Sequence, residues 1–298
     1  TGFYSAHIYF DNIHLTPAGL SDAYTVKMNS SGVVQWAKKG AGTDEDRGKG
    51  ITFDNNGNIY VAGYFTDQAT FSGTTITNNG TTGGFLVKYD PNGQLTWIKS
   101  NCCGTSEYDG IAIDENGFVY TTGYFEGSVT IGNTTLTSSG NADILIVKYD
   151  PSGNIIWAKK AGGPYEDMAN GISLDSINHM LYITGQLDDH GYFDAHYAGA
   201  AGNRDVFIAA YDLDGNCQWV KPYGGTQRDI AYGITNDREG NIFCTGIYTG
   251  NATFGSYTLA GNLLSDYFIE KSVPPRSIRQ LFQQRILVSA LQIAVTCF

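Results

Sequence analysis

The chain has 298 residues, a net charge of −11 at pH 7 and only 16% charged residues. The negative charge disfavours nucleic acid and anionic membrane surfaces as partners, because like charges would repel. With 38 glycines, 20 tyrosines and 15 phenylalanines, the composition favours short strands joined by tight turns.

The chain opens on Thr1-Gly2, which is typical of the end of a strand and not of a signal peptide. We therefore expect the first residue to be a cut in a longer polypeptide. A Thr-Gly or Ala-Gly pair returns at a fixed distance of 34 residues before each tryptophan, at Gly2, Gly63, Gly123 and Gly185. The tryptophans, Trp36, Trp97, Trp157 and Trp219, lie 61, 60 and 62 residues apart, so the chain is a tandem array.

Each unit is predicted to contain four strands. In the second unit, "GITFD" is followed by a Gly turn and by "IYVAGYF". An excursion of roughly 20 residues, rich in Thr, Gly and Asn, leads to "GFLVKYD", and another Gly turn enters the Trp strand "LTWIKS". Four antiparallel strands per unit, repeated radially, predict an all-β chain folded as a β-propeller with blades of about 61 residues. A β-solenoid is the alternative.

The repeat predicts one propeller domain over residues 1–271. Five blades are visible, of which three are complete and two are partial, at residues 1–42, 43–103, 104–163, 164–225 and 226–271. Closed propellers typically have about 4–8 blades, and we expect this chain to be a piece of a larger ring. Alternatively, the two partial blades share one sheet of a four-bladed ring.

Residues 272–298 do not follow the repeat. The spacing predicts a fifth tryptophan at Gln280, and this segment has no Gly, Asp or Glu but three of the seven arginines. A terminal helix, a foreign segment and a translated frameshift are the alternatives. The abrupt change favours a segment that does not belong to the propeller.

The repeated pattern, D-x-F-x-V-K-Y-D-x-x-G-x-x-x-W-x-K-x-x-G-G followed by G-I-x-x-D-x-x-G-x-x-Y-x-T-G-Y-F, resembles the SBBP-type β-propeller repeat of secreted bacterial proteins. The resemblance covers residues 1 to about 271. It implies an extracellular or bacterial cell-surface module. The second unit departs from the pattern at Gly83 and at Cys102-Cys103, and Ala210 stands where other units have lysine.

Two repeated features are interpreted as structural. One tryptophan at the same phase of each complete unit is what core packing requires, and a ligand site would need it only in some blades. The Asp-rich turns, such as "YDPSGN" and "DLDGN", fit hairpins in which Asp bonds its own backbone. "DLDGN" resembles the start of a calcium loop but lacks the later ligands.

Asp46, Asp167 and Asp229 each follow a tryptophan by ten residues, on the predicted crossing to the next blade; the second unit has Ser106 near this position. These carboxylates are candidates for binding a cation or a basic partner, and the alternative is that they bond the backbone of the crossing. Cys102 and Cys103 lie on another crossing and are a second candidate site, because vicinal cysteines can form a reducible ring.

The excursion of the fourth unit, "DDHGYFDAH", contains the weak metal candidates Asp188, Asp189, His190, Asp194 and His196. The alternative is a set of polar loop residues. The five cysteines of the chain give neither a disulfide framework nor a zinc signature. We predict no cofactor, with a divalent cation as the alternative, and no catalytic residue is assigned.

These observations favour a non-enzymatic extracellular bacterial scaffold that binds a protein or a glycan, with no nucleic-acid partner and no membrane span. Excursions and crossings are expected on the same face of the propeller, so that this variable face would carry recognition. The alternative is a propeller enzyme, either a metal-dependent hydrolase or lyase that uses "DDHGYFDAH" or a quinone-dependent oxidoreductase. A spacer without its own activity is a third possibility.

Overall fold

The computed structural model describes residues 1–101, 104–261 and 264–272, and its regular structure there consists of strands, as the composition predicted. The segment after residue 272, for which a terminal helix was one of three alternatives, lies outside the described residues. The described part of the chain contains no helix that is long and apolar enough to cross a bilayer.

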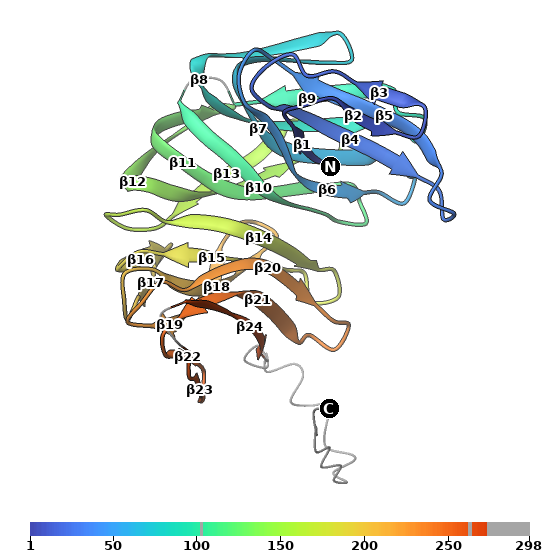
Figure 1. Cartoon of the computed structure of the whole chain (residues 1–298). Coiled ribbons are helices and arrows are strands. Elements are labelled where there is room, and N and C mark those ends of the chain that lie inside the picture. The colour runs from blue at the N-terminus through green and yellow to red at the C-terminus, as the bar shows by residue number, and fades with distance from the viewer. Residues whose placement is uncertain (102–103, 262–263, 273–298) are drawn as a thin grey trace.

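Five antiparallel blades follow one another along the chain, from the first blade near the N-terminus to the fifth at the other end of the arc (Figure 1). The first blade consists of β1 (Gly2–Tyr4), β4 (Asp22–Met28) and β5 (Val34–Ala41). The second consists of β6 (Asp46–Phe53), β7 (Ile59–Phe71), β8 (Thr74–Tyr89) and β9 (Leu95–Ser100). The pairing of β5 with β7 joins the first two blades into one sheet. The third consists of β10 (Thr105–Ile113), β11 (Val119–Ile131), β12 (Thr134–Tyr149) and β13 (Ile155–Ala161).

The last two blades repeat the arrangement. The fourth consists of β14 (Met168–Asp175), β15 (Met180–Leu187), β18 (Asp205–Asp212) and β19 (Cys217–Gly225). The fifth consists of β20 (Ile230–Asn236), β21 (Ile242–Thr249) and β24 (Ser265–Ser272). The first strands of neighbouring blades, β6, β10, β14 and β20, contact one another in that order, so the blades are arranged side by side around their inner strands.

The excursions are hairpins. In the second and third blades the two middle strands simply continue through the excursion. In the other three blades the excursion forms a separate small hairpin: β2 (Ile8–Phe10) with β3 (Ile13–Leu15), β16 (His190–Phe193) with β17 (His196–Gly199), and β22 (Ala252–Phe254) with β23 (Tyr257–Leu259). Sequence analysis predicted the position of the excursions but not their strands, because Thr, Asn and Gly suit both loops and two-sided polar hairpins.

The turn between the first two strands of a blade, and the turn between its last two strands, is closed by one Asp or Asn. In the second blade, Oδ1 of Asp90 accepts the backbone N–H groups of Asn92 at 2.9 Å and Gln94 at 2.7 Å, and Gly93 adopts φ 77°. The same bonds recur at Asn29, Asp54, Asp114, Asp150, Asp212 and Asp237. The hairpin interpretation of these turns is thus confirmed, including the turn in "DLDGN".

The hydrophobic core lies between blades. Each of four buried clusters joins residues of one blade to residues of the next, as when Ile144 and Ile146 of the third blade pack with Leu181, Ile183 and Phe207 of the fourth. We call the face that a blade turns toward the next blade its leading face, and the opposite one its trailing face. Each core therefore forms from one leading and one trailing face.

The tryptophans belong to this contact between blades. The ring of Trp157 lies beside Tyr120 of its own blade, and its Nε1–H donates to the carbonyl of Leu213 in a turn of the fourth blade at 3.3 Å. A Cβ added at Gly215 of that turn would lie 3.0 Å from the ring. Trp36 contacts Gly93 and Pro91 of the second blade in the same way. The packing role predicted for the tryptophans is confirmed, and their partner is the next blade.

We expect Trp157→Ala to lower the free energy of unfolding by about 3 kcal/mol, the low end of the range for truncating a Trp in a core. The contact with the next blade is lost and a cavity remains. Denaturant unfolding followed by circular dichroism measures this. Tyr257→Ala is the control, because Tyr257 is 75% exposed and its loss should stay within about 0.5 kcal/mol. Equal midpoints for the two variants would contradict the assignment.

Candidate functional site

In the second to fifth blades, the hairpin of the excursion lies against the crossing that leads into its own blade. Gly40 and Ala41 pair with Phe71 and Thr70, and Gly224 and Gly225 pair with Thr253 and Ala252. A Cβ added at Gly163 would collide with the carbonyl of His190, and one at Gly225 with the carbonyl of Asn251. The Gly-Gly pair of the repeat is therefore required by the close approach of two backbones.

The predicted carboxylates Asp46, Asp167 and Asp229 are buried at these crossings, with relative exposure of 0%. Asp167 accepts the N–H of Gly163 at 2.6 Å and the N–H of Asp188 at 2.8 Å. Asp229 accepts the corresponding N–H groups of Gly225 and Thr249. One side chain thus joins the end of a blade to the second strand of the next blade.

A second aspartate, which sequence analysis did not single out, faces each of these residues. Asp22 and Asp205 begin β4 and β18, Asp143 lies at the corresponding position within β12, and all three are buried. Parallel bridges one residue earlier, such as Ala142 with Glu166, place the two aspartates of a crossing side by side. A Cβ at Gly224 would lie 2.6 Å from Oδ1 of Asp205 and 2.7 Å from Oδ2 of Asp229, so the two carboxylates converge there. Their signal was the Asp that precedes "AY", "IL", "VF" and "YF" at the same phase in four units.

Burial raises the pKa of an aspartate in each of these pairs. Desolvation raises the pKa of Asp46 to about 8, and the negative charges of Asp22 and Asp44 add to it. Desolvation likewise raises the pKa of Asp167 to about 7, with a contribution from Asp143, and that of Asp205 to about 7. Near neutral pH each pair therefore holds part of a proton, which reduces the repulsion between two buried like charges.

The crossing between the second and third blades is neutral. Gly83 and Ser106 replace both aspartates, and Ser106 Oγ accepts the N–H of Gly84 and the side-chain amide of Asn101, each at 3.2 Å. Asn101 in turn accepts the hydroxyl of Tyr108 at 2.9 Å. The two carboxylates are lost together, which indicates that they act as a unit at the other three crossings.

The candidate metal ligands in the excursion of the fourth blade contact different partners. Asp188 lies 3.9 Å from Arg204, and Asp189 pairs with His190 at 2.7 Å. Asp194 accepts the N–H of Cys217 at 2.7 Å, and His196 begins β17. Across residues 1–101, 104–261 and 264–272, no three His, Cys, Asp or Glu side chains converge as a metal site.

Cys102 and Cys103 lie outside the described residues. Cys217 and Cys244 are buried free thiols, and burial raises the pKa of each to about 12. Both side chains therefore stay protonated and unreactive at neutral pH.

One cross-strand position at the tip of the hairpins differs in chemistry between blades. It holds hydroxyl pairs in three blades, Thr70 with Thr75, Thr130 with Thr135 and Thr253 with Thr258. In the fourth blade it holds Tyr192 and Tyr197, whose rings are 5.5 Å apart, and in the first blade Tyr9 stacks on His14 at 4.4 Å. Tyr192 and Tyr197 are 55% and 60% exposed. The hairpins therefore display different side chains on one scaffold.

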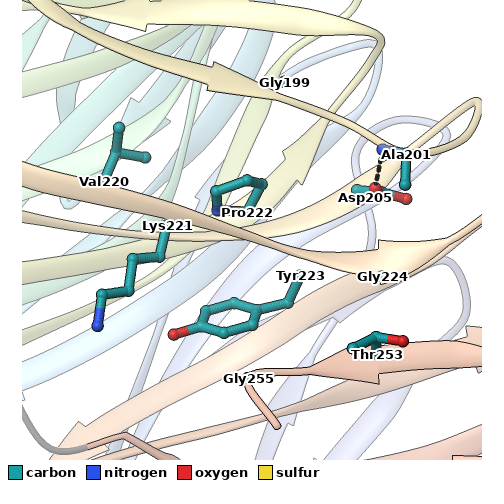
Figure 2. A pocket seen from close by; sticks show the side chains of 10 residues that line it. All are labelled: Gly199, Ala201, Asp205, Val220, Lys221, Pro222, Tyr223, Gly224, Thr253 and Gly255. Atoms are coloured by element: carbon teal, nitrogen blue, oxygen red, sulfur yellow. Dashed lines mark hydrogen bonds between the residues drawn. The ribbon is translucent and has the colours of Figure 1, made fainter. Parts of the chain in front are cut away.

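A pocket of about 380 Å³ opens between the hairpins of the fourth and fifth blades (Figure 2). Lys221 and Tyr223 extend from the same side of β19, and Thr253 and Gly255 close the pocket from the fifth blade. Asp205 lies deeper, with its Oδ2 bonded to the N–H of Ala201. The pocket offers a cation, hydroxyls and an aromatic ring, which suits a polar ligand.

The family model of the SBBP β-propeller repeat matches residues 40–64, the stretch that contains the first crossing and Asp46. The chain is 25% identical over 262 residues to the uncharacterized WD repeat-containing protein L264 of Acanthamoeba polyphaga mimivirus, covering 81% of this chain and 16% of that protein. It is 27% identical over 112 residues to the regulatory protein FlaEY of Caulobacter vibrioides, covering 36% of this chain and 12% of that protein. The chain thus spans less than a fifth of either relative.

Antiparallel sheets that share cores with their neighbours, together with these matches, define a β-propeller repeat scaffold, as the sequence predicted. Within this scaffold, residues 40–64 match the SBBP-type β-propeller repeat.

The raised pKa of Asp46 predicts a pH dependence of stability. Because the folded state binds this proton more tightly than the unfolded chain, the contribution is complete below the ordinary value of 3.8 and is lost as the pH rises through about 8. For Asp46→Asn, which cannot titrate, we expect the free energy of unfolding to fall less steeply over this range, by up to about 1.4 kcal/mol per pH unit.

Denaturant titrations at a series of pH values measure the difference in slope between wild type and variant. Ser106→Ala, at the same position of the neutral crossing, is the control and should leave the slope unchanged. Identical slopes for wild type and Asp46→Asn would show that the buried carboxylate does not take up a proton on folding.

Proposed function

We propose that this repeat scaffold is a non-enzymatic extracellular module of a bacterial protein that binds a protein or glycan ligand on the side formed by the excursion hairpins. The observation that carries the proposal is the contrast between copies. Crossings, turns and cores keep the same residue types, whereas the exposed hairpin pair changes from Thr-Thr to Tyr-Tyr and Tyr-His. Residues that only support the fold have no need to vary at this one exposed position.

The fourth blade offers the best-developed binding surface. Tyr192 and Tyr197 form an exposed aromatic pair, and tyrosine supplies a large contact area with a polar end at a low cost in conformational entropy. The pocket with Lys221 and Thr253 adds a cation and a hydroxyl from the same region of the chain. Exposed rings and hydroxyls of this kind suit the mixed apolar and polar faces of a sugar or of a protein loop.

The chemistry of the pocket favours binding over catalysis. The hydroxyl of Tyr223 is bonded to Ser272 at 3.0 Å, and that of Thr253 to Thr258 at 3.2 Å. Thr253 therefore pairs with a second hydroxyl instead of the general base that a nucleophile requires. The hydroxyl of Tyr223 also interacts with the carboxylate of Glu270, but burial raises the pKa of Tyr223 to about 12, so this hydroxyl stays protonated at neutral pH. The resemblance of the repeat to secreted bacterial proteins supports the extracellular location.

Screening the folded chain on glycan and protein arrays tests the proposal. We expect a ligand whose affinity falls at least about fivefold in the double variant Tyr192→Ser and Tyr197→Ser, because two stacking contacts of about 0.5–1.5 kcal/mol each are lost. Thr70→Ser with Thr75→Ser, at the same position of the second blade, is the matched control and should bind normally. Absence of any ligand, or binding that survives both the tyrosine variant and Lys221→Ala, would refute the proposal.

A further inference from the structure

The two ends of the blade array present opposite faces of the same interface. Along β24 of the fifth blade, Tyr267 and Ile269 lie on the leading face and are 86% and 82% exposed. The residues in register with them in the fourth blade, Val206 and Ile208, are 1% and 0% exposed because the fifth blade covers them. Within the described chain, the leading face of the fifth blade is therefore an apolar surface without a neighbouring blade.

In the first blade the trailing face is the exposed one. On its trailing face, Met28 is 49% exposed, whereas Tyr89 in register with it in the second blade is 1% exposed. Phe10 and Tyr24 form the aromatic pair of this face, with ring centroids 5.2 Å apart, and both are partly exposed. The same pair in the fourth blade, Phe193 with Phe207, is fully buried by the third blade.

We propose that the leading face of the fifth blade docks onto the trailing face of the first blade of a second copy, so that chains associate head to tail. The four internal cores establish that leading and trailing faces of this repeat fit each other although their side chains differ between junctions. Such an interface is heterologous, because two different surfaces meet, and the docked pair keeps one free leading face and one free trailing face.

Polar contacts of the internal junctions indicate the register. Lys27 Nζ donates to the carbonyl of Pro91 in a turn of the next blade at 2.7 Å, and Lys148 donates to the carbonyl of Leu213 at 2.8 Å. Lys271 is in register with these lysines on β24, and the matching turn of the first blade is Asn29–Gly32. In the docked pair, Lys271 would reach the carbonyl of Ser30 of the second copy.

The inner strand of the fifth blade also lacks the contact that the other inner strands make with the next blade. A Cβ at Gly50 would lie 2.9 Å from Ile111 of the next blade, one at Gly110 would lie 3.0 Å from Ile172, and one at Gly171 would lie 3.3 Å from Ile234. At Gly233 of the fifth blade, the described residues place no other blade within 4 Å. The exposed surface thus extends from β24 to the inner strand.

Sedimentation velocity of the full chain over a wide range of concentrations tests the proposal, at an ionic strength of about 0.15 M so that the net charge is screened. The leading-face variant is Tyr267→Lys with Ile269→Lys, and the trailing-face variant is Met28→Lys. We expect concentration-dependent association of the wild type and a monomer for each variant alone. Because each variant keeps the surface that the other has lost, an equimolar mixture should form dimers and nothing larger.

Tyr257→Lys, on an exposed hairpin away from both surfaces, is the matched control and should associate like the wild type. Circular dichroism of each variant checks that the fold is intact. Every substituted side chain is about half exposed or more in the wild type. A wild type that stays monomeric at all concentrations, as closure of the ring within one molecule would produce, overturns the proposal. A mixture of the two variants that stays monomeric overturns it as well.

Discussion

The structure depends on the buried aspartate at the crossing between blades. A crossing must leave one sheet, turn, and begin the inner strand of the next, and buried N–H groups along it need acceptors. Asp167 and Asp229 supply these acceptors to two segments at once, the end of the preceding blade and the end of the second strand of the following blade. The position of each blade relative to its neighbour is therefore fixed by a side chain and not by the hydrophobic core alone.

The other features of the repeat follow from this constraint. The crossing can run close to the next hairpin only if the chain has glycine there, which explains Gly163 and Gly225. Burying an ionised carboxylate in this position costs free energy, and a second aspartate beside it increases this cost. The pKa values of Asp167 and Asp205 are therefore raised, and each pair retains part of a proton near neutral pH. At the crossing between the second and third blades, the uncharged side chains of Ser106 and Asn101 make the polar contacts instead, so no charge is buried there. With the blades fixed in this way, the outer hairpins are free to vary without affecting the cores.

Much of the fold was predictable from the sequence because the repeat is regular. The spacing of Trp36, Trp97, Trp157 and Trp219 gave the period, and the Asp and Gly of each turn gave the hairpins, since both depend on local backbone conformation. What could not be predicted depends on contacts between units. The carboxylate of Asp167 faces Asp143, 24 residues earlier and in another blade, and Trp157 contacts a turn 56 residues later.

The candidate site was less predictable for the same reason. The cluster at residues 188–196 is dense in the sequence, but its members lie in different parts of the hairpin. His190 begins β16 and pairs with Asp189, whereas Asp194 lies in the turn after β16 and bonds the backbone of Cys217. The best binding candidates are Tyr192, within that cluster, and Tyr197, directly after it. No sequence pattern indicates them, and only the register of β16 and β17 pairs them. The ligand roles assigned to Asp46, Asp167 and Asp229 stay a prediction, now for buried groups between blades.

Hydrogen exchange at the crossings tests the central claim most directly. The backbone N–H groups of Gly163, Asp188, Gly225 and Thr249 all donate to a buried aspartate, whereas that of Ser152 donates to the exposed Asp150 in a turn. If the buried aspartates fix the blades, the four crossing amides exchange only on global unfolding, as slowly as amides within β15, and Ser152 exchanges by local opening. Exchange of the crossing amides as fast as that of Ser152 would contradict the account.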